Sequence, residues 1–372
     1  MNLRPGRLLF GSGRLRALGE LVRDIGGSRA LVVTDPGVRS AGHLDTAVDS
    51  LRRARVGYAI FDEVAESPTT ADVEEGAAIA RAEAVDFIVG LGGGSSMDCA
   101  KGINFLTSNG GRIEDYQGFN RAPLPMLSSV GVPCTAGTGS EAQSFALIAA
   151  EKSQPKMACG DEKVRFKAVI LDPLLAQTAP LEVVRVAGFD ALAHAVESYV
   201  TKTGNPLSRL YAREAWILLD RYYPKVASGG ASEEMWGSML LGAHLAGAAI
   251  ESSMLGAAHA CANPLSASFG VTHGIAVALM LPSVVRANAC AVDELYSELL
   301  GAVGVQGGGE ELATRLEDLR TLGALPSRLH ELDVDGAEIG HLSEQAMQQW
   351  TLDHNPRALP IAAVKALYEA VL

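Results

Sequence analysis

Residues 86–105 read DFIVGLGGGSSMDCAKGINF, which is the pattern of a strand, a glycine loop and a helix. The β-rich run over 86–91 predicts a buried strand, three glycines follow it directly, and a helix is expected from about Ser96 to Phe105. Outward from this stretch, β-rich runs and helical periodicity alternate. Further strands are expected at 30–34, 56–61, 126–132 and 168–171, and a helix at 70–84. This alternation predicts a parallel α/β sheet.

The pattern changes after Pro180, where long Ala- and Leu-rich windows with helical period dominate. Helices are expected at 183–200, 207–222, 233–250 and 275–287, and no strand is expected there. A chain of 372 residues also exceeds one typical core. Two domains are therefore expected, an α/β domain over 1–178 and an all-helical domain over 179–372. The glycines at 307–309 are interpreted as a surface loop between helices.

Composition excludes several classes of protein. Hydrophobic residues make up 48% of the chain and charged residues 20%, which allows a large core and argues against wholesale disorder. The net charge of −12 disfavours a nucleic-acid partner. No secretory signal is expected at the N-terminus, and no apolar stretch reaches the ~18 residues of a membrane span. Five cysteines without a CxxC pair suggest reduced thiols in a cytoplasmic protein.

The glycine run Gly92-Gly93-Gly94-Ser95 lies between an expected strand and an expected helix. Glycines let the backbone approach a pyrophosphate closely, and the helix that follows offers free N–H groups and the positive end of its dipole. The run is not the GxGxxG fingerprint, so a plain tight turn is an equal alternative from this feature alone.

Two further features fit a dinucleotide. The loop over 133–141, PCTAGTGSE, offers hydroxyls and glycines for phosphate or ribose oxygens. Asp35 ends the strand at 30–34, where dinucleotide enzymes place a carboxylate on the ribose hydroxyls. Because that carboxylate repels a 2′-phosphate, it favours NAD over NADP. The alternative is that Asp35-Pro36-Gly37 is only a turn.

Asp190 and His194 are the first residues of a possible metal site. Their spacing of four puts both on one face of a helix that is otherwise mostly apolar, so both need a polar partner. His259 follows in a run of small residues, and His273 precedes an apolar helix. One carboxylate and three imidazoles suit Fe²⁺ or Zn²⁺. Taken singly, a histidine beside apolar residues is more often a hydrogen-bonded core residue than a metal ligand, and this is how we interpret the other five. Spacing alone does not bring the three segments together.

Together these residues resemble the iron-containing (group III) alcohol dehydrogenase family, and the resemblance runs through nearly the whole chain. Its motifs here are Ser67-Pro68-Thr69, Gly92 to Ser95 with Asp98 and Lys101, Thr135 to Glu141, Leu171-Asp172-Pro173, the four possible metal ligands, and Asn355-Pro356-Arg357. The resemblance implies the dehydroquinate synthase-like fold, in which a dinucleotide-binding α/β domain is followed by a helical metal-binding domain, with a catalytic cleft between them.

The resemblance also assigns roles to residues. Asp190, His194, His259 and His273 are expected to hold the metal. Residues expected at the dinucleotide are Asp35, Gly92, Gly93, Gly94, Ser95, Asp98, Thr135, Thr138, Ser140, Phe145 and Lys156. One catalytic position departs from the family: Asn263 stands where many members carry a second histidine, four residues after the third ligand. Proton transfer by that histidine is therefore in doubt.

The expected function is metal-dependent interconversion of a small alcohol and an aldehyde or ketone with NAD(H), in a homodimer by family habit. A metal-independent reductase resembling maleylacetate reductase is the nearest alternative, and the complete ligand set argues against it. A lyase related to dehydroquinate synthase would need a Lys/Arg cluster that the helical half does not clearly show. A non-catalytic dinucleotide-binding protein is the third alternative.

Overall fold

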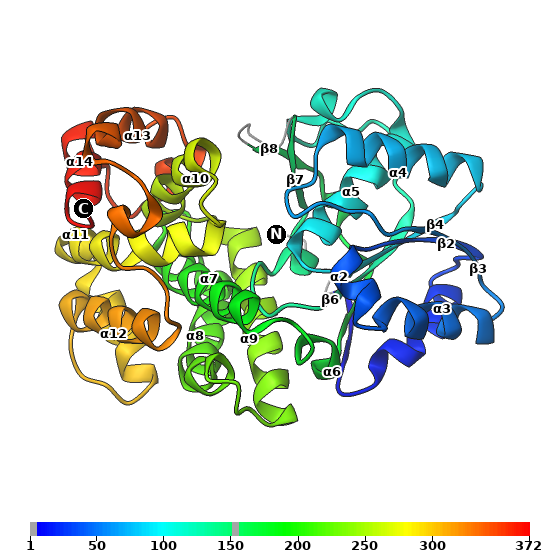
Figure 1. Cartoon of the computed structure of the whole chain (residues 1–372), viewed down its shortest axis with the longest axis horizontal. Coiled ribbons are helices and arrows are strands. Elements are labelled where there is room, and N and C mark those ends of the chain that lie inside the picture. The colour runs from blue at the N-terminus through cyan, green and yellow to red at the C-terminus, as the bar shows by residue number, and fades with distance from the viewer. Residues whose placement is uncertain (1–5, 151–155) are drawn as a thin grey trace. The chain divides into compact units, whose positions relative to one another are not determined.

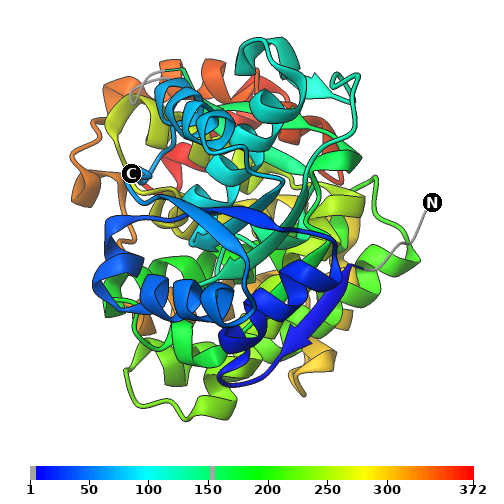
Figure 2. The same cartoon turned by 90° about the vertical axis from the view of Figure 1, so that its right-hand side faces the viewer.

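The computed structural model describes residues 6–150 and 156–372, which form two compact units (Figures 1 and 2). Unit 1 contains the described residues up to Thr135 and those of Ser140–Ala179; unit 2 contains Ala136–Gly139 and Pro180–Leu372. The expected boundary at 178/179 leaves residues 136–139 in the first domain. Their contacts group them with unit 2 because they pack closely there: a Cβ on Gly139 would lie 2.6 Å from the Cα of Gly247.

A six-stranded sheet forms the centre of unit 1, in the order β1-β9-β6-β4-β2-β3. Its neighbouring strands pair in parallel, which confirms the expected parallel α/β fold. Every residue of β4 is buried, as a central strand of a parallel sheet requires. The strands are β1 (Arg7–Phe10), β2 (Arg29–Val33), β3 (Gly57–Phe61), β4 (Phe87–Gly92), β6 (Ser128–Pro133) and β9 (Ala168–Leu171).

Helices cover both faces of this sheet (Figure 1). Leu18 and Leu51, from two helices on one face, share a core with Val32 and Val89 of the strands. On the other face α5 packs against β4, and α4 packs against α5. The helices are α1 (Leu18–Asp24), α2 (Pro36–Ser40), α3 (His43–Arg53), α4 (Thr70–Ala82), α5 (Gly94–Asn109) and α6 (Pro173–Ala176). Short 3₁₀ turns lie at Arg14–Ala17, Ile113–Tyr116, Ser140–Ala142 and Glu162–Val164.

The sequence analysis did not predict β1 or a second, three-stranded sheet. That sheet has the order β5-β8-β7, with β5 (Gly118–Phe119), β7 (Phe145–Ala149) and β8 (Lys156–Gly160). β7 and β8 pair antiparallel, and the rings of Phe119 and Phe145 stack at 5.4 Å. β5 contains no buried residue and β8 contains two, so their sequences lack the buried apolar run that marks β2, β4 and β9.

Unit 2 is helical, and its described residues contain no strand, as expected. Its helices are α7 (Leu181–Val200), α8 (Pro206–Ala227), α9 (Glu233–Ser253), α10 (Ala257–Phe269), α11 (His273–Ala302), α12 (Gly309–Leu322), α13 (Ile339–Ala346) and α14 (Ile361–Glu369). Short 3₁₀ turns lie at Leu329–Leu332, Gly336–Glu338 and Trp350–His354. All residues of α7 from Gly188 to Val200 are buried, so this helix lies inside the unit.

Helix α11 is the longest in unit 2. It bends at Val292, whose φ of −141° and ψ of 27° are not helical. By length and composition alone its apolar part could cross a membrane, although no uninterrupted apolar stretch was found in the sequence. Of its most apolar 18-residue window, 61% is buried inside the protein, as in a helix that packs into a protein core.

Candidate functional site

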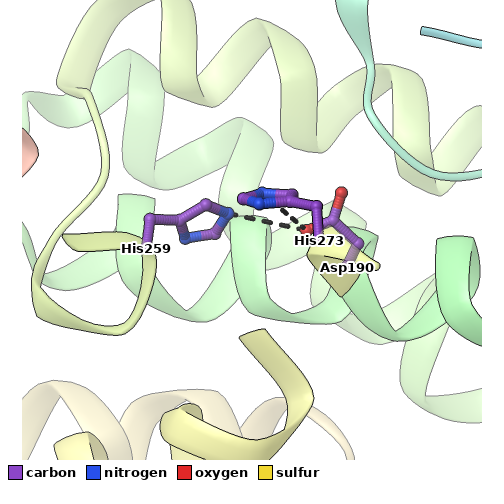
Figure 3. Close-up of side chains that lie close together, drawn as sticks. All are labelled: Asp190, His259 and His273. Carbon is purple, nitrogen blue, oxygen red and sulfur yellow. Dashed lines mark ion pairs between the residues drawn. The ribbon is translucent and has the colours of Figure 1, made fainter. Parts of the chain in front are cut away.

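Four side chains from three helices of unit 2 converge on one oxygen atom. Asp190 and His194 lie one turn apart on α7, His259 lies in the first turn of α10, and His273 is the first residue of α11. The Oδ1 of Asp190 is 3.4 Å from the Nε2 of His194, 3.5 Å from that of His259 and 3.9 Å from that of His273. Figure 3 shows His259 and His273 pointing toward Asp190. The segments that the sequence left separate are therefore brought together.

Glycine makes part of this convergence possible. A Cβ on Gly274 would lie 2.7 Å from both the backbone oxygen and the Cγ1 of Val186. Only a residue without a side chain lets the start of α11 approach α7 this closely. His273 is therefore positioned in two ways: it is the first residue of α11, and the next residue, Gly274, lets this end of the helix approach α7.

Burial is uneven across the cluster. Asp190, His194 and His259 are 3–5% exposed, whereas the side chain of His273 is 39% exposed. Solvent therefore reaches the cluster on its His273 side. A buried carboxylate beside buried imidazoles is costly unless its charge is balanced.

The pKa values reflect this balance. Burial raises the pKa of Asp190, but the surrounding imidazoles, His194 first, outweigh it and hold that pKa well below its usual range. Burial lowers the pKa of His194, and the negative charge of Asp190 offsets this effect only in part. Burial also opposes charge on His259, yet the carboxylates on its two sides raise its pKa to about 9. The site thus favours a negative aspartate surrounded by compensating positive charge.

The donors fit a divalent cation. The Oδ1 of Asp190 and the Nε2 of His259 are buried, and neither makes a hydrogen bond to the described residues. Four ligands at about 2.0–2.1 Å from one ion in a tetrahedron lie about 3.3–3.4 Å apart. The separations of 3.4, 3.5 and 3.9 Å from Asp190 to the three histidines are close to that value. The ligand atoms of Asp190, His259 and His273 all lie within 4.8 Å of one another, a set that does not include His194. One carboxylate and three imidazoles are also donors that first-row divalent metals prefer.

Glu197 is a functional candidate that the sequence analysis missed. It lies on α7, seven residues after Asp190 and three after His194, so the helical period puts all three on one face. Its Oε2 is 2.5 Å from the Nδ1 of His259, the ring nitrogen on the side away from Asp190. The spacing of four residues from Asp190 to His194 and three from His194 to Glu197 could have identified it from the sequence.

Asn263 lies one helical turn after His259 on α10 and is half-buried. Its Nδ2 donates a hydrogen bond to the Oε1 of Gln349 at 2.9 Å. The side chain is therefore held in place, and no group that titrates near neutral pH stands at this position.

In unit 1, the expected nucleotide residues gather where β2 and β4 end. Asp35 caps α2 through its Oδ1, which accepts from the N–H of Val38 at 3.0 Å, and its Oδ2 accepts from the Oγ of Ser96 at 2.9 Å. Gly92 has a φ of +150°, and a Cβ there would lie 2.8 Å from that same Oδ2. A Cβ on Gly93 would meet only Thr135, at 3.6 Å. Asp35 is thus both a helix cap and part of the glycine loop.

Asp98 and Ser140 take part in a different, buried arrangement. The Oγ of Ser140 donates to Asp98 at 2.6 Å and accepts from the ammonium of Lys101 at 2.7 Å. Lys101 is fully buried and also donates to the carbonyl oxygen of Phe145 at 2.7 Å. These contacts join α5 to the segment after β6, so a structural role accounts for both side chains. Contact of either residue with a dinucleotide stays a prediction.

The remaining expected nucleotide residues occupy separate places. Gly94 begins α5, and the hydroxyl of Ser95 in the next position donates to the carbonyl oxygen of Glu66. Phe145 begins β7, and the exposed Lys156 begins β8. Thr138 belongs to the segment that groups with unit 2.

Comparison with known proteins gives the same family across both units. A family model described as iron-containing alcohol dehydrogenase matches residues 5–173, and one described as Fe-containing alcohol dehydrogenase family, C-terminal, matches residues 185–372. The NAD-dependent methanol dehydrogenase of Bacillus methanolicus is 32% identical over 375 residues, covering 99% of this chain and 98% of that protein.

Solved structures agree with this result. A 1,3-propanediol oxidoreductase superposes with a TM-score of 0.95 at 30% identity, covering 99% of this chain and 98% of that one. The sulfoacetaldehyde reductase of Bifidobacterium kashiwanohense, in complex with NAD⁺, superposes with a TM-score of 0.91 at 25% identity, covering 100% and 98%. The substrates in the names of these similar proteins differ: methanol, 1,3-propanediol and sulfoacetaldehyde.

Proposed function

The chain belongs to the iron-containing alcohol dehydrogenase family and is an oxidoreductase that interconverts an alcohol and an aldehyde or ketone, and we propose which residues hold its metal and which cofactor it uses. The proposed active site binds a divalent metal ion, Fe²⁺ or Zn²⁺, through Asp190, His194, His259 and His273. The proposed redox cofactor is NAD(H), bound at the glycine loop of unit 1.

One observation carries the proposal. The buried Oδ1 of Asp190 is surrounded by three imidazole nitrogens at 3.4–3.9 Å, yet it makes no hydrogen bond among the described residues. A protein core normally satisfies such a group. A cation at this place would bind the aspartate oxygen and use the lone pairs of the imidazoles.

The metal, when bound, supplies a Lewis acid that polarises the substrate oxygen. The residues of this chain have other tasks. Asp190 contributes one negative charge, so a divalent ion held there would keep a net positive charge toward the substrate oxygen. His273, the exposed ligand, marks the side from which a substrate oxygen reaches the centre. The buried side of the cluster excludes water and thereby strengthens these interactions.

NAD(H) is supported by two relatives and by one residue. The methanol dehydrogenase is NAD-dependent by name, and the sulfoacetaldehyde reductase structure holds NAD⁺. Asp35 places a carboxylate beside the glycine loop, within contact distance of where Gly92 would carry a Cβ. A carboxylate there hydrogen-bonds a ribose diol and repels a 2′-phosphate.

Oxidation of an alcohol by NAD⁺ releases one proton from the alcohol oxygen, and this chain removes it without a histidine at 263. The amide of Asn263 donates and accepts hydrogen bonds but does not titrate. It therefore orients a substrate or a water, and the proton leaves through water or a ribose hydroxyl.

The homodimer expected from the family has one feature of unit 1 in its favour. β1 is an edge strand of the large sheet, and Leu8 and Phe10 on it are 43% and 45% exposed. Edge strands with apolar side chains readily pair with another chain. Light scattering should give about twice the 38.9 kDa of one chain, and a mass of one chain would contradict the dimer.

The experiment that tests the proposed function is reduction of a panel of short aldehydes with NADH and with NADPH. The protein is first stripped of metal with a chelator and then reloaded with Fe²⁺ or Zn²⁺. Turnover that needs the metal and favours NADH supports the proposal. Equal turnover without metal would support the metal-independent reductase, and no turnover with any pair would support a non-catalytic nucleotide-binding protein.

A further inference from the structure

Glu197 is a buried carboxylate with no task in the function proposed above. It is 4% exposed and lies on the same face of α7 as two of the proposed ligands. Its Oε2 is 2.5 Å from the Nδ1 of His259, and its Oε1 accepts the N–H of Ala258 at 2.7 Å. One carboxylate thus contacts both the ring of a proposed ligand and the backbone that carries it.

The chemistry of the imidazole gives this contact a consequence. A neutral imidazole has one nitrogen that donates and one that accepts, whereas a carboxylate only accepts. Because Glu197 faces Nδ1, it holds the single proton of the neutral ring there, and a metal that displaces the other proton finds the lone pair on Nε2. That nitrogen is the one 3.5 Å from the Oδ1 of Asp190.

We propose that Glu197 is a positioning residue for the metal centre, which fixes the tautomer and the ring orientation of His259 and thereby sets the affinity for the ion. The inference rests on the proposed function, because it assumes that His259 binds a metal through Nε2. Carboxylate partners of this kind typically contribute about 10–100-fold in metal affinity.

A second polar side chain holds the same helix end without touching the ring. The Oδ1 of Asn355 accepts the N–H of Ala257 at 3.2 Å, and its amide is paired with that of Asn288 at 2.9 Å in both directions. A Cβ on Gly256 would lie 3.0 Å from both this Oδ1 and the Oε1 of Glu197. Asn355 therefore shares the backbone task of Glu197 but not its contact with His259, which makes it a matched control.

The test compares Glu197→Gln with Asn355→Ser. Glutamine has nearly the size of glutamate, but its amide cannot satisfy both neighbours. If the amide oxygen of the glutamine accepts from the N–H of Ala258, its NH₂ group faces the Nδ1 of His259. Nδ1 must then accept a hydrogen bond, so the ring proton moves to Nε2, and Nε2 no longer has a lone pair for the metal. Zn²⁺ affinity is measured by competition with a chromophoric chelator, and thermal unfolding of the metal-free proteins reports their folding.

We expect Zn²⁺ affinity to fall about 10–100-fold in Glu197→Gln and to stay within about 3-fold of the original in Asn355→Ser. Unchanged affinity in Glu197→Gln would overturn the inference and leave the proposed function intact. Equal losses in both variants would also overturn it, since Glu197 would then act only on the helix end. If His259→Ala binds Zn²⁺ as tightly as the unmodified protein does, the proposed function is overturned, and the inference with it.

A second measurement does not depend on the folding of a variant. In the Zn²⁺-loaded unmodified protein, long-range ¹H–¹⁵N spectra should show His259 with its proton on Nδ1 and the metal on Nε2. The opposite arrangement would overturn the inference.

Discussion

The two proposed sites are built in opposite ways. The nucleotide loop of unit 1 depends on missing side chains: a Cβ on Gly92 would lie 2.4 Å from the Oγ of Ser96. The metal cluster of unit 2 depends on side chains that are present, with four donors from three helices around one oxygen. A backbone site is thus damaged by adding atoms and a side-chain site by removing them. If the sites are independent, each change should impair one kind of binding and leave the other intact.

His259→Ala should have the largest effect. It removes one ligand from the cluster, and the Lewis acid that the metal supplies is worth several kcal/mol. With about 1.36 kcal/mol per tenfold change in rate, kcat/KM should fall by about 10³ or more. Metal content by mass spectrometry should drop below one ion per chain, while NADH affinity by fluorescence stays within about 2-fold. Full activity in this variant after metal stripping would rule out the assignment of the ligands.

Gly92→Ala and Gly93→Ala should weaken NADH binding and leave the metal in place, and they should differ from each other in stability. The added methyl at Gly92 meets Ser96 and Asp35 and requires a strained φ, so unfolding should become easier by about 1–3 kcal/mol. At Gly93 it meets only Thr135 at 3.6 Å, so stability should stay within about 0.5 kcal/mol.

Both glycine variants should bind NADH about 10-fold more weakly and keep their metal, because the methyl occupies space that a pyrophosphate approaches. Calorimetric titration with NADH checks this. NADH affinity that is unchanged in Gly93→Ala would mean that the glycines serve folding alone.

Asp35→Asn should shift cofactor preference. The amide oxygen still caps α2 by accepting from Val38, and the amide NH₂ can still pair with the hydroxyl of Ser96, so only the charge is lost. The ratio of kcat/KM for NADPH to that for NADH should rise about 10-fold, or about 1.4 kcal/mol. Asp35→Gly should raise the same ratio, and it should also lower the free energy of unfolding by a few tenths of a kcal/mol, because the side-chain cap of α2 is lost. A preference of the unmodified protein for NADPH would show that Asp35 has another role.

Asn263→His should have the smallest effect. It introduces an imidazole one turn from His259, and pre-steady-state rates should then show a new ionisation between about pH 6 and 8. The unmodified protein should lack it, because asparagine does not titrate. Profiles that superimpose while only stability changes would make Asn263 a structural residue that holds Gln349.

Sequence patterns could predict the elements that carry a buried apolar run or a long helical period. All residues of β4 are buried, so it stands out as an apolar run before the glycines, and α7 is long enough for its helical period to be recognised. β1, β5 and β8 were missed because few or none of their residues are buried, so no such run marks them in the sequence.

The candidate site divides in the same way. The spacing of Asp190 and His194 predicted that they share a helix face, and the same spacing could have identified Glu197. That α10 and α11 bring His259 and His273 to that face follows from packing, such as the approach allowed by Gly274. The resemblance to a family, not the spacing, suggested this convergence. The resemblance named Asp98 and Lys101 in one motif, but the sequence did not indicate that Lys101 is buried and contacts both Asp98 and Ser140.

Metal dependence of turnover is tested by an anaerobic titration of the metal-free protein with Fe²⁺, followed by aldehyde reduction with NADH. Turnover should rise linearly with added Fe²⁺ and stop rising at one ion per chain, a chelator should reverse the rise, and His259→Ala should show no rise. Full turnover of the metal-free protein, unaffected by added Fe²⁺ or by chelator, would contradict this metal dependence.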